Sequence, residues 1–189
     1  VEIGRDTGDV GDIDIFFMGG GQDQDQDLVA ADLTGPKREA VKAAIDGGAA
    51  LLAVCGGYQF LGSHYTTVEG TRLPGLGLVD LRTEAGETRA IGNVLIETEG
   101  LGLYPPTLVG FENHAGRTFL APGLKPLGRC LLGRGNNGDD GVEGVVSGTV
   151  FGTYLHGSLL PKNPHLTDHL LQLALSHRRP GARLSALPA

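Results

Sequence analysis

The sequence lacks the features that define several large classes of protein. It has only two cysteines, Cys55 and Cys130, which stand far apart and outside any CxxC pair, so neither a disulfide framework nor a zinc ribbon is indicated. No apolar stretch approaches the roughly 18 to 20 residues that a membrane-spanning helix needs, and the first residues are charged. These absences favour a cytoplasmic protein whose thiols stay reduced.

Positive charge is also scarce. The chain has 15 Lys and Arg against 22 Asp and Glu, a formal net charge of −7, and no basic cluster that would attract nucleic acid or an anionic membrane. No G-x-x-x-x-G-K-[ST] motif is present for ATP phosphates. GRGNNG (Gly133–Gly138) matches G-x-G-x-x-G, but no helical pattern follows it. We interpret it as a loop, and we expect no nucleotide cofactor in this chain.

The first third of the chain alternates strand and helix patterns. DIDIFFMGGG (residues 12–21) reads as a buried strand with a tight exit, and AALLAVC (residues 49–55) as a second buried strand that enters a helix. Residues 22–33 and 36–47 have helical spacing between them. This order predicts an α/β fold with a mostly parallel central sheet flanked by helices.

The rest of the chain predicts a strand-rich half and a closing helix. Short β-like runs fill residues 76–151, and helical spacing returns near residue 163, with Asn163 as N-cap and Pro164 in the first turn. A chain of 189 residues that is 40% hydrophobic fits one domain. We expect that domain to cover residues 1–178, followed by a flexible tail at 179–189.

Cys55 is the candidate nucleophile. A lone cysteine beside apolar residues is ordinarily a small buried hydrophobe, and Cys130 keeps that interpretation. Cys55 differs because small residues flank it: Ala53 precedes it by two positions, and Gly56 and Gly57 follow. A strained strand-to-helix elbow requires this pattern. A thiol at the start of a helix would also be favoured as thiolate.

A cysteine nucleophile needs a base, and the chain has six histidines. His156, which ends the run VFGTYLH, is the first candidate, because a late strand would present it at the edge of the sheet where α/β sites gather. His114 in GFENHAGR is the second. These residue types alone indicate a cysteine hydrolase or transferase.

Two segments resemble metal sites, and we expect neither to bind a metal. His165 and His169 are spaced i, i+4 on the closing helix, but there is no HExxH and no evident third ligand. DQDQD (Asp23–Asp27) hints at a calcium loop, yet Leu28 and Thr34 stand where glycine and glutamate are needed. An acidic first helical turn is the better interpretation.

Several segments together resemble a known family over nearly the whole chain and in the same order. They are FFMGGGQDQDQ, LLAVCGGYQFLGSHY, GLGLVDLRTEAGETRAIGN, VGFENHAGRTFL, GRGNNGDDGVEG and GTYLHGSLLPKNPHLTDHLL. The chain is similar to the GatD family, the glutaminase subunits of lipid II isoglutaminyl synthases. That family belongs to the class I glutamine amidotransferases of the cobyric acid synthase type. The resemblance implies their flavodoxin-like fold.

The resemblance also implies roles for individual residues. Cys55 would attack the amide of glutamine and form a glutamyl thioester, while His156 would move the proton to the departing ammonia. The backbone N–H of Gly56, with one from the Gly20–Gly21 turn, would form the oxyanion hole. Substrate-binding roles fall to two further side chains, Arg89 in GETRAIG and Gln59 one helical turn beyond the cysteine.

The sequence departs from the wider family at two places. Many class I glutaminases carry glutamate two residues after the histidine, where this chain has Ser158; the GatD and cobyric acid synthase branches share this departure. We hypothesise that the acid orienting His156 comes from elsewhere, for example from the partner subunit. Family members also carry a strand and a helix before the segment matching Val1–Ile3, and we expect that unit to be missing from this sequence.

The resemblance supplies a partner and an acceptor as well. It implies a heterodimer with a MurT-like Mur ligase, which would bind ATP and Mg²⁺ and use the ammonia to amidate the D-glutamate α-carboxyl of lipid II. Three alternatives stay open: the glutaminase part of a cobyrinic or cobyric acid amidase, a non-catalytic binding module of the same fold, and a cysteine peptidase or amidase that works without a partner.

Overall fold

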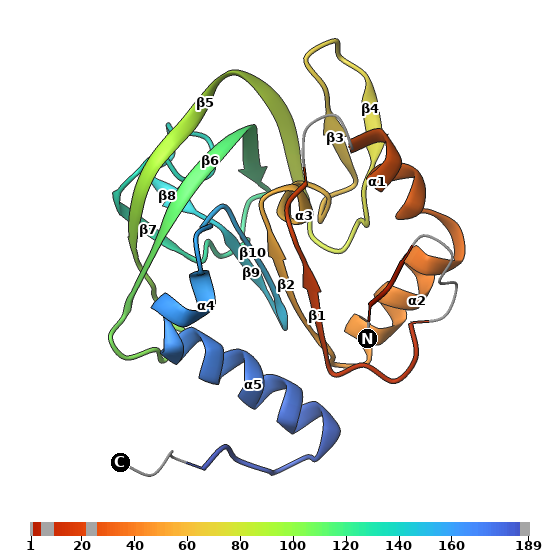
Figure 1. Cartoon of the computed structure of the whole chain (residues 1–189), viewed down its shortest axis with the longest axis vertical. Coiled ribbons are helices and arrows are strands. Elements are labelled where there is room, and N and C mark those ends of the chain that lie inside the picture. Colours follow the sequence, from red (N-terminus) through yellow and green to blue (C-terminus); the bar gives the residue numbers. More distant parts are fainter. Residues whose placement is uncertain (1, 5–9, 22–25, 186–189) are drawn as a thin grey trace.

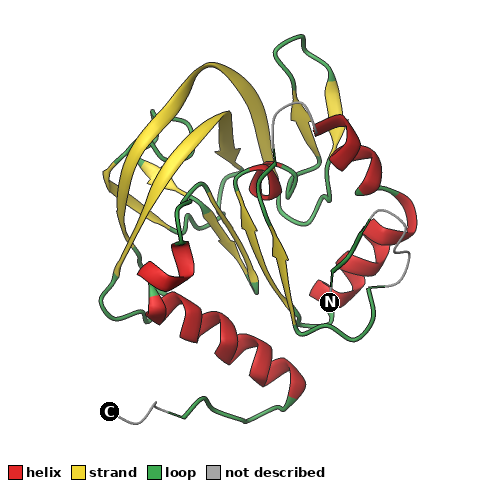
Figure 2. Cartoon of the chain, viewed as in Figure 1, coloured by secondary structure: helices red, strands yellow, loops and turns green. Residues whose placement is uncertain are grey.

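The computed structural model describes residues 2–4, 10–21 and 26–185. Its strands and helices form an α/β fold with two sheets, drawn in yellow in Figure 2. The α/β prediction is therefore confirmed. The predicted acidic turn at Asp23–Asp27 lies mostly outside the described residues. None of the described helices is long and apolar enough to cross a membrane.

The first sheet is the parallel one that the sequence predicts. It has four strands in the order β1-β2-β10-β9, of which β1, β2 and β10 run parallel and β9 is antiparallel. The strands are β1 (Ile15–Met18), β2 (Ala50–Val54), β9 (Val145–Ser147) and β10 (Val150–Thr153).

β2 is buried on both faces because helices cover both sides of this sheet. Leu51 and Ala53 belong to one apolar cluster with residues of α1 (Gln26–Asp32) and α2 (Gly35–Asp46). Leu52 and Val54 belong to another, with residues of α5 (Pro164–Arg178). Figure 1 shows α5 running below the sheet and α1 and α2 on the opposite side. An unbroken apolar run is the pattern expected of such a strand.

The second sheet is mainly antiparallel and occupies the middle of the chain. The path of its strands is β4-β3-β5-β7-β8, and β6 pairs with β5 off that path. The two long strands form a curved hairpin that arches beside the first sheet (Figure 1). The bounds are β3 (His64–Thr66), β4 (Arg72–Pro74), β5 (Leu81–Glu97), β6 (Thr107–Leu120), β7 (Gly128–Leu132) and β8 (Val142–Glu143).

Of three local predictions, the helix after Cys55 and the N-cap position of Asn163 are confirmed, and the strand at residues 76–80 is wrong. The helix after Cys55 is a single turn, α3 (Gly56–Gln59). The run at residues 76–80 forms a loop rather than a strand, because its backbone N–H groups donate to carbonyls of residues 60–62. Asn163 precedes α5, but its side chain does not cap that helix. It instead bonds both backbone groups of Val109, near the start of β6, and the carbonyl of Leu159, the first residue of α4 (Leu159–Lys162).

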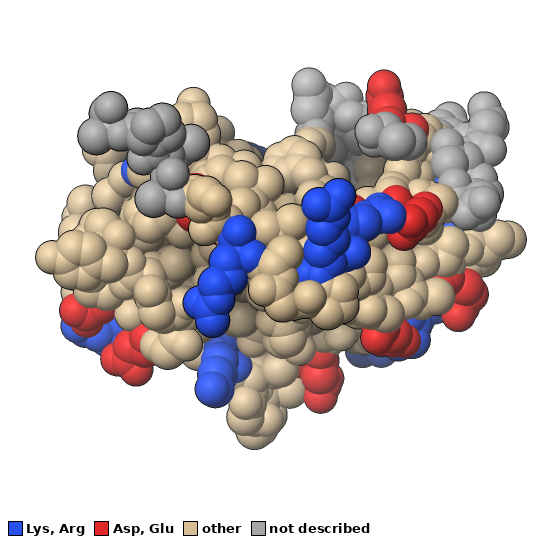
Figure 3. All heavy atoms as spheres, turned by 90° about the horizontal axis from the view of Figure 1, so that it is seen from below, with Lys and Arg blue, Asp and Glu red and all other residues tan. Residues whose placement is uncertain are grey.

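Both charge signs occur together on the lower surface of the molecule, seen in Figure 3. Arg178, at the end of α5, pairs with Asp12 and Asp14, while His177 donates to Asp14 at 2.9 Å. These pairs join the C-terminal helix to the segment that enters β1. The side chain of Gln172 on α5 bonds backbone groups of Ala182 and Leu184, which lie in the predicted tail.

Candidate active site

The parallel strands bring three sequence-distant segments to one edge of the first sheet. β1 leads into Gly19–Gly21, β2 leads into Cys55, and β10 leads into Tyr154–His156. Because parallel strands end on the same side of a sheet, their exits meet there. Gly20 shows this closeness: a Cβ on it would lie 3.6 Å from both Cys55 Sγ and His156 Cε1.

Cys55 occupies a strained elbow, as predicted. Its backbone has φ 54° and ψ −109°, and among the described residues only Cys55 and Ser158 are non-glycine with positive φ. Such strain concentrates at functional positions. Gly57 has to be glycine, because a Cβ there would lie 2.4 Å from the carbonyl oxygen of Met18. α3 is only one turn long, so its dipole stabilises the Cys55 thiolate less than the sequence suggested.

The glycines predicted to form an oxyanion hole lie against one another. A Cβ on Gly56 would sit 3.2 Å from the backbone nitrogen of Gly21 and 3.6 Å from Gly20 Cα. The N–H of Gly57 is already used by the carbonyl of Gly19 at 3.2 Å, which fixes the two turns to each other. The amides of Gly56 and of the Gly20–Gly21 turn are thus brought beside Cys55, where an oxyanion-hole role remains our prediction.

His156 lies at the end of β10 and is tied to β6. Its backbone N–H donates to Phe111 O at 2.7 Å and its carbonyl accepts from Phe111 N–H at 3.2 Å. Burial, together with electrostatic interaction with His114 and Arg89, lowers the pKa of His156 from its ordinary value. The imidazole is therefore neutral near pH 7, the form that a general base requires.

The predicted acid partner of His156 is not found among the described residues. His156 Nε2 is buried and has no hydrogen-bond partner in that part of the chain. Ser158 stands where many class I enzymes carry glutamate, and it adopts a left-handed conformation with φ 62°, directly after Gly157 with φ 73°. Gly157 still lines the pocket, whereas Ser158 is not among its lining residues.

Arg89 reaches the same pocket from the second sheet. The register of β5 on β6 shifts between Ala85 and Ala90, and Arg89 stands next to this irregularity. Asn113 Oδ1 accepts from Arg89 Nε at 3.0 Å, and the carbonyl of Asn113 accepts from a terminal nitrogen at 3.1 Å. The guanidinium is exposed at the rim, where a substrate carboxylate could bind it.

Gln59 is present in the pocket, but it is almost entirely buried. Only 4% of it is exposed, its side chain bonds the Tyr154 hydroxyl, and a Cβ on Gly116 would lie 2.3 Å from Gln59 Nε2. The side chain of Gln59 therefore packs from α3 against β6. This packing supports a structural role beside the predicted contact with substrate.

The alternative base, His114, lines this pocket too, but both of its ring nitrogens face groups of its own strand. Nδ1 lies 2.8 Å from the carbonyl of Gly116, Nε2 lies 3.6 Å from Glu112 Oε2, and the ring stacks on Tyr154 at 3.5 Å. His156, by contrast, comes from the same sheet edge as Cys55. The geometry favours His156 as the base.

The pocket formed by these residues has a volume of about 1030 Å³. Its polar lining was only partly predicted: Asn93 and Asn113 from the second sheet and Lys162 from α4 were missed. Asn113 stands inside a motif that the sequence displays, and the period-2 alternation of β6 places it on the same face as Phe111, which also lines the pocket. The lining residues are Gly20, Gly21, Cys55, Gln59, Arg89, Asn93, Phe111, Asn113, His114, His156, Gly157 and Lys162.

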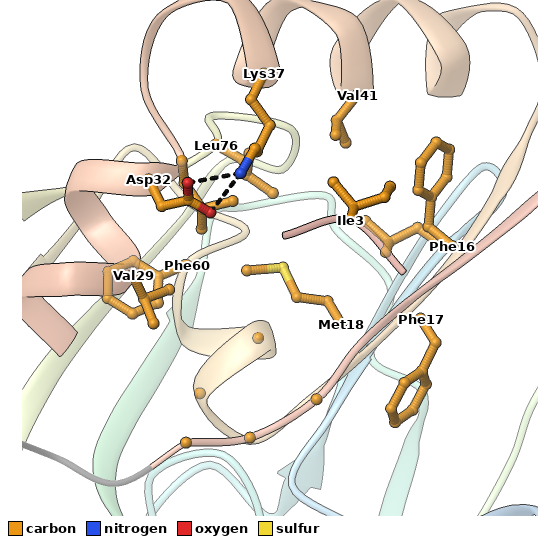
Figure 4. Close-up of a pocket in the computed structure, with 17 residues that line it drawn as sticks. Ile3, Phe16, Phe17, Met18, Val29, Asp32, Lys37, Val41, Phe60 and Leu76 are labelled. Atoms are coloured by element: carbon orange, nitrogen blue, oxygen red, sulfur yellow. Dashed lines mark hydrogen bonds and ion pairs between the residues drawn. The ribbon is translucent and has the colours of Figure 1, made fainter. Parts of the chain in front are cut away.

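A second, smaller cavity lies behind the glycine turn. It measures about 320 Å³, and Figure 4 shows apolar side chains such as Phe16, Met18 and Phe60 around it. Its charged members, Asp32 and Lys37, neutralise each other through contacts of 2.6 Å. No cysteine or histidine is among its described lining residues, so the chemistry belongs to the larger pocket.

The segments that resembled metal or nucleotide sites make other contacts or form a loop in the structure. His165 bonds the carbonyl of Thr107 at 2.9 Å, and the His169 ring packs edge-on against Phe151. Gly133–Gly138 forms a loop without a following helix, as predicted. Among the described residues, no group of three or more His, Cys, Asp or Glu side chains could hold a metal.

Comparison with known proteins identifies a family and close relatives. Residues 2–164 match the CobB/CobQ-like glutamine amidotransferase domain. The chain is 45% identical over 179 residues to the lipid II isoglutaminyl synthase (glutamine-hydrolyzing) subunit GatD of Staphylococcus aureus strain N315, covering 94% of this chain and 71% of that protein. For GatD of Streptococcus pneumoniae strain R6 the identity is 41% over 175 residues, with 92% and 66% covered.

A cobyric acid synthase of Pelotomaculum thermopropionicum is more distant. It is 35% identical over 184 residues, covering 88% of this chain but 33% of that protein. Among solved structures, one described as a glutamine amidotransferase has a TM-score of 0.63 at 22% identity, covering 85% of this chain and 79% of the other. PurLQS from Thermotoga maritima gives 0.63 at 16% identity, with 86% and 81% covered. At these identities the structural matches establish the fold alone.

Proposed function

This chain belongs to the CobB/CobQ-like glutamine amidotransferases, and we propose that it is the glutamine-hydrolysing subunit of a lipid II isoglutaminyl synthase. One observation carries the proposal. The pocket that holds Cys55 and His156 occurs in a chain that is 45% identical to a GatD subunit over 94% of its length. The following steps describe how these residues would hydrolyse glutamine.

The reaction begins at Cys55. His156, neutral near pH 7 because its pKa is lowered, takes the thiol proton, and the sulfur attacks the side-chain amide carbon of L-glutamine. The tetrahedral oxyanion accepts hydrogen bonds from the amides of Gly56 and the Gly20–Gly21 turn. His156 then returns the proton to the amide nitrogen, the C–N bond breaks, and ammonia leaves a glutamyl thioester on Cys55.

Water completes the turnover. His156 removes a proton from water, which attacks the thioester carbonyl; the C–S bond breaks, glutamate leaves, and the thiol is restored. Arg89 at the rim would bind the α-carboxylate of glutamine, with Asn113 holding the guanidinium in place. Gln59 would close the inner wall of the pocket.

The ammonia would be used by a partner of the Mur ligase class. No ATP-binding motif is visible in this sequence, so the activation of the acceptor carboxyl, with ATP and Mg²⁺, falls to that partner. The acceptor is the D-glutamate α-carboxyl of lipid II. The partner would also supply the acid that orients His156, consistent with the unbonded Nε2 in the described chain. We expect these steps to take place in the cytoplasm, where peptidoglycan precursors are made.

The cobyric acid alternative is less well supported. The cobyric acid synthase from Pelotomaculum shares 35% identity, and this chain corresponds to 33% of its length. The binding-module alternative would have no need for a strained cysteine beside a histidine of lowered pKa. We therefore retain the glutaminase subunit of lipid II amidation as the proposal.

The proposal is tested by glutamate release from L-glutamine, measured with this chain alone and together with its Mur ligase partner, with Cys55→Ala as the blank. Release that depends on Cys55 and rises with the partner supports it, and amidation of lipid II is then the second assay. Turnover as fast without the partner as with it would contradict the hypothesis that the partner supplies the acid that orients His156. Silence in both conditions would contradict the glutaminase assignment.

A further inference from the structure

The wall of the catalytic pocket includes a buried group of polar side chains that the proposed mechanism does not use. Its centre is the pair Glu112 and His114, two residues apart on β6 and exposed by only 2% and 1%. Both side chains therefore point to the same, inner face of the strand. Burying an ionisable pair is costly unless its members satisfy each other.

Glu112 is a carboxylate in this environment. Its two oxygens accept backbone N–H groups, from Arg134 at 2.8 Å and from Gly135 at 3.0 Å. Burial alone would raise the pKa of Glu112, but His114 and these two backbone donors outweigh burial and hold it below its ordinary value. The glycine-rich loop at residues 133–138 is thereby anchored to the strand that carries His114.

The hydrogen bonds of His114 fix which of its nitrogens carries a proton. The carbonyl of Gly116 can only accept, so Nδ1, at 2.8 Å, must be the donor. Nε2 then faces Glu112 Oε2 at 3.6 Å with no hydrogen-bond partner among the described residues. A neutral ring would direct a lone pair at a carboxylate, whereas a protonated ring forms an ion pair.

The aromatic neighbour favours the same state. The His114 ring lies flat on Tyr154, with centroids 3.5 Å apart and planes 5° apart, and a cation over an aromatic face is stabilised. Tyr154 remains a neutral phenol, because burial raises its pKa, and its hydroxyl bonds Thr118 at 2.8 Å. Tyr154 stands two residues before His156, so the stack connects His114 to the segment that carries the base.

We propose that His114 is a positioning residue for glutamine hydrolysis: held as an imidazolium between Glu112 and Tyr154, it is a fixed positive charge beside the Cys55–His156 pair. It touches no reacting atom and acts through its field and through the Tyr154 segment. A nearby cation disfavours protonated His156 and favours thiolate at Cys55. It thus keeps the pair in its active ionisation states at lower pH. The proposal rests on the glutaminase function proposed above.

Other charged and titratable groups surround His114, and they define the variants that must be compared. The groups on β5 and β6 are Arg89, Glu112 and Arg117; those that follow the parallel strands are Cys55, Tyr154 and His156; and Glu143 on β8 contacts the backbone of Tyr154. Arg89 also lowers the pKa of His156. It must therefore stay unchanged while the pair is tested.

The charge model predicts a graded series of pH profiles. His114→Gln removes the cation and leaves the Glu112 carboxylate uncompensated, so the acidic limb of kcat/KM for glutamine should move to higher pH by about one unit. Glu112→Gln removes the counter-ion, so His114 loses its proton and with it the positive charge; the limb should move less, in the same direction. The double variant should resemble Glu112→Gln, because no uncompensated carboxylate remains. His165→Gln changes a partly buried histidine on α5 that bonds the carbonyl of Thr107 at the start of β6; it is the matched control and should leave the limb unmoved.

Two readouts do not depend on glutamine turnover. The first is the rate of Cys55 alkylation by iodoacetamide against pH, followed by peptide mass, so that Cys130 is read separately. Its midpoint should rise in His114→Gln by about the same one unit. The second is the ¹⁵N chemical shifts of the His114 ring in the wild-type chain at neutral pH, which should show both nitrogens protonated.

The outcomes separate the two proposals. If the alkylation midpoint shifts as expected while wild-type protein releases no glutamate, the positioning role stands and the glutaminase function fails. If His114→Gln lowers activity equally at every pH and leaves the alkylation midpoint unmoved, His114 is merely structural and the inference is overturned. A neutral His114 in the wild-type spectrum would overturn it even if every variant failed to fold.

Discussion

The two sheets contribute different things to the pocket. The parallel strands β1, β2 and β10 supply Cys55, His156 and the glycine turn, all placed by backbone geometry at strand ends. The antiparallel arm, β5 and β6, supplies Arg89 beside a register shift, and Asn113 and His114 as neighbours on β6. The positions of the reacting groups thus depend on the backbone at the strand ends, and recognition depends on the pairing of two long strands.

The two regions also differ in how firmly they hold their residues. The strand exits are crowded, so that even a methyl group at Gly57 would overlap Met18. Arg89 and Asn113, by comparison, lie at an exposed rim beside a register shift. We therefore expect substitutions in the first region to remove the chemistry or the fold, and substitutions in the second to weaken substrate binding.

The largest effect is expected at Cys55. Cys55→Ala removes the nucleophile, so glutamate release should fall by about 10³-fold or more, while the melting temperature changes little. His156→Ala should have a comparable effect on kcat. Turnover that survives in Cys55→Ala would show that the parallel sheet does not supply the nucleophile.

A change at Gly57 should damage the fold of the same region. Gly57→Ala places a Cβ 2.4 Å from Met18 O, and the backbone shift it forces should cost about 2 to 3 kcal/mol in the free energy of unfolding. Urea denaturation measures this. Gly92→Ala on β5 is the control, because a Cβ there meets nothing within 4 Å. Equal stability of the two variants would contradict the crowding at the strand exits.

Arg89→Ala tests the other region. Loss of the guanidinium should raise KM for glutamine by about tenfold, with a smaller change in kcat, because the contact is made in the ground state and in the transition state alike. Arg82→Ala on the same strand is the matched control: Arg82 is exposed and bonds Glu84 at 3.0 Å, outside the pocket. A fall in kcat at unchanged KM would assign Arg89 to the chemistry instead.

The smallest effect concerns the pH dependence of stability. Burial raises the pKa of Glu143 to about 7, above its value in the unfolded chain, so the folded state binds the proton more tightly. The stability that this provides is fully present at low pH and is lost as the pH rises through about 7. Glu143→Gln should flatten this dependence by on the order of 1 kcal/mol. Thermal melts of both proteins between low pH and neutral pH measure this. The same dependence of stability on pH in Glu143→Gln and in the wild type would show that Glu143 is ionised throughout and would contradict the prediction.

The sequence predicts the parallel region far better than the antiparallel arm. The doubly buried β2 has an unbroken apolar run, and the small residues around Cys55 indicate its elbow, because both signals are local. The length of β5 could not be predicted, since residues 82–92 are polar and depend on pairing with β6, far along the chain. The Glu112–His114–Tyr154 group is likewise a product of tertiary contact, which no local pattern contains.

The most direct test of the division between the two sheets is labelling with a chloroketone analogue of L-glutamine, with the adduct located by peptide mass. The account predicts one adduct, on Cys55, which L-glutamine prevents and which forms more slowly in Arg89→Ala than in Arg82→Ala. An adduct on Cys130, or labelling of Cys55 that neither glutamine nor Arg89 influences, would contradict it.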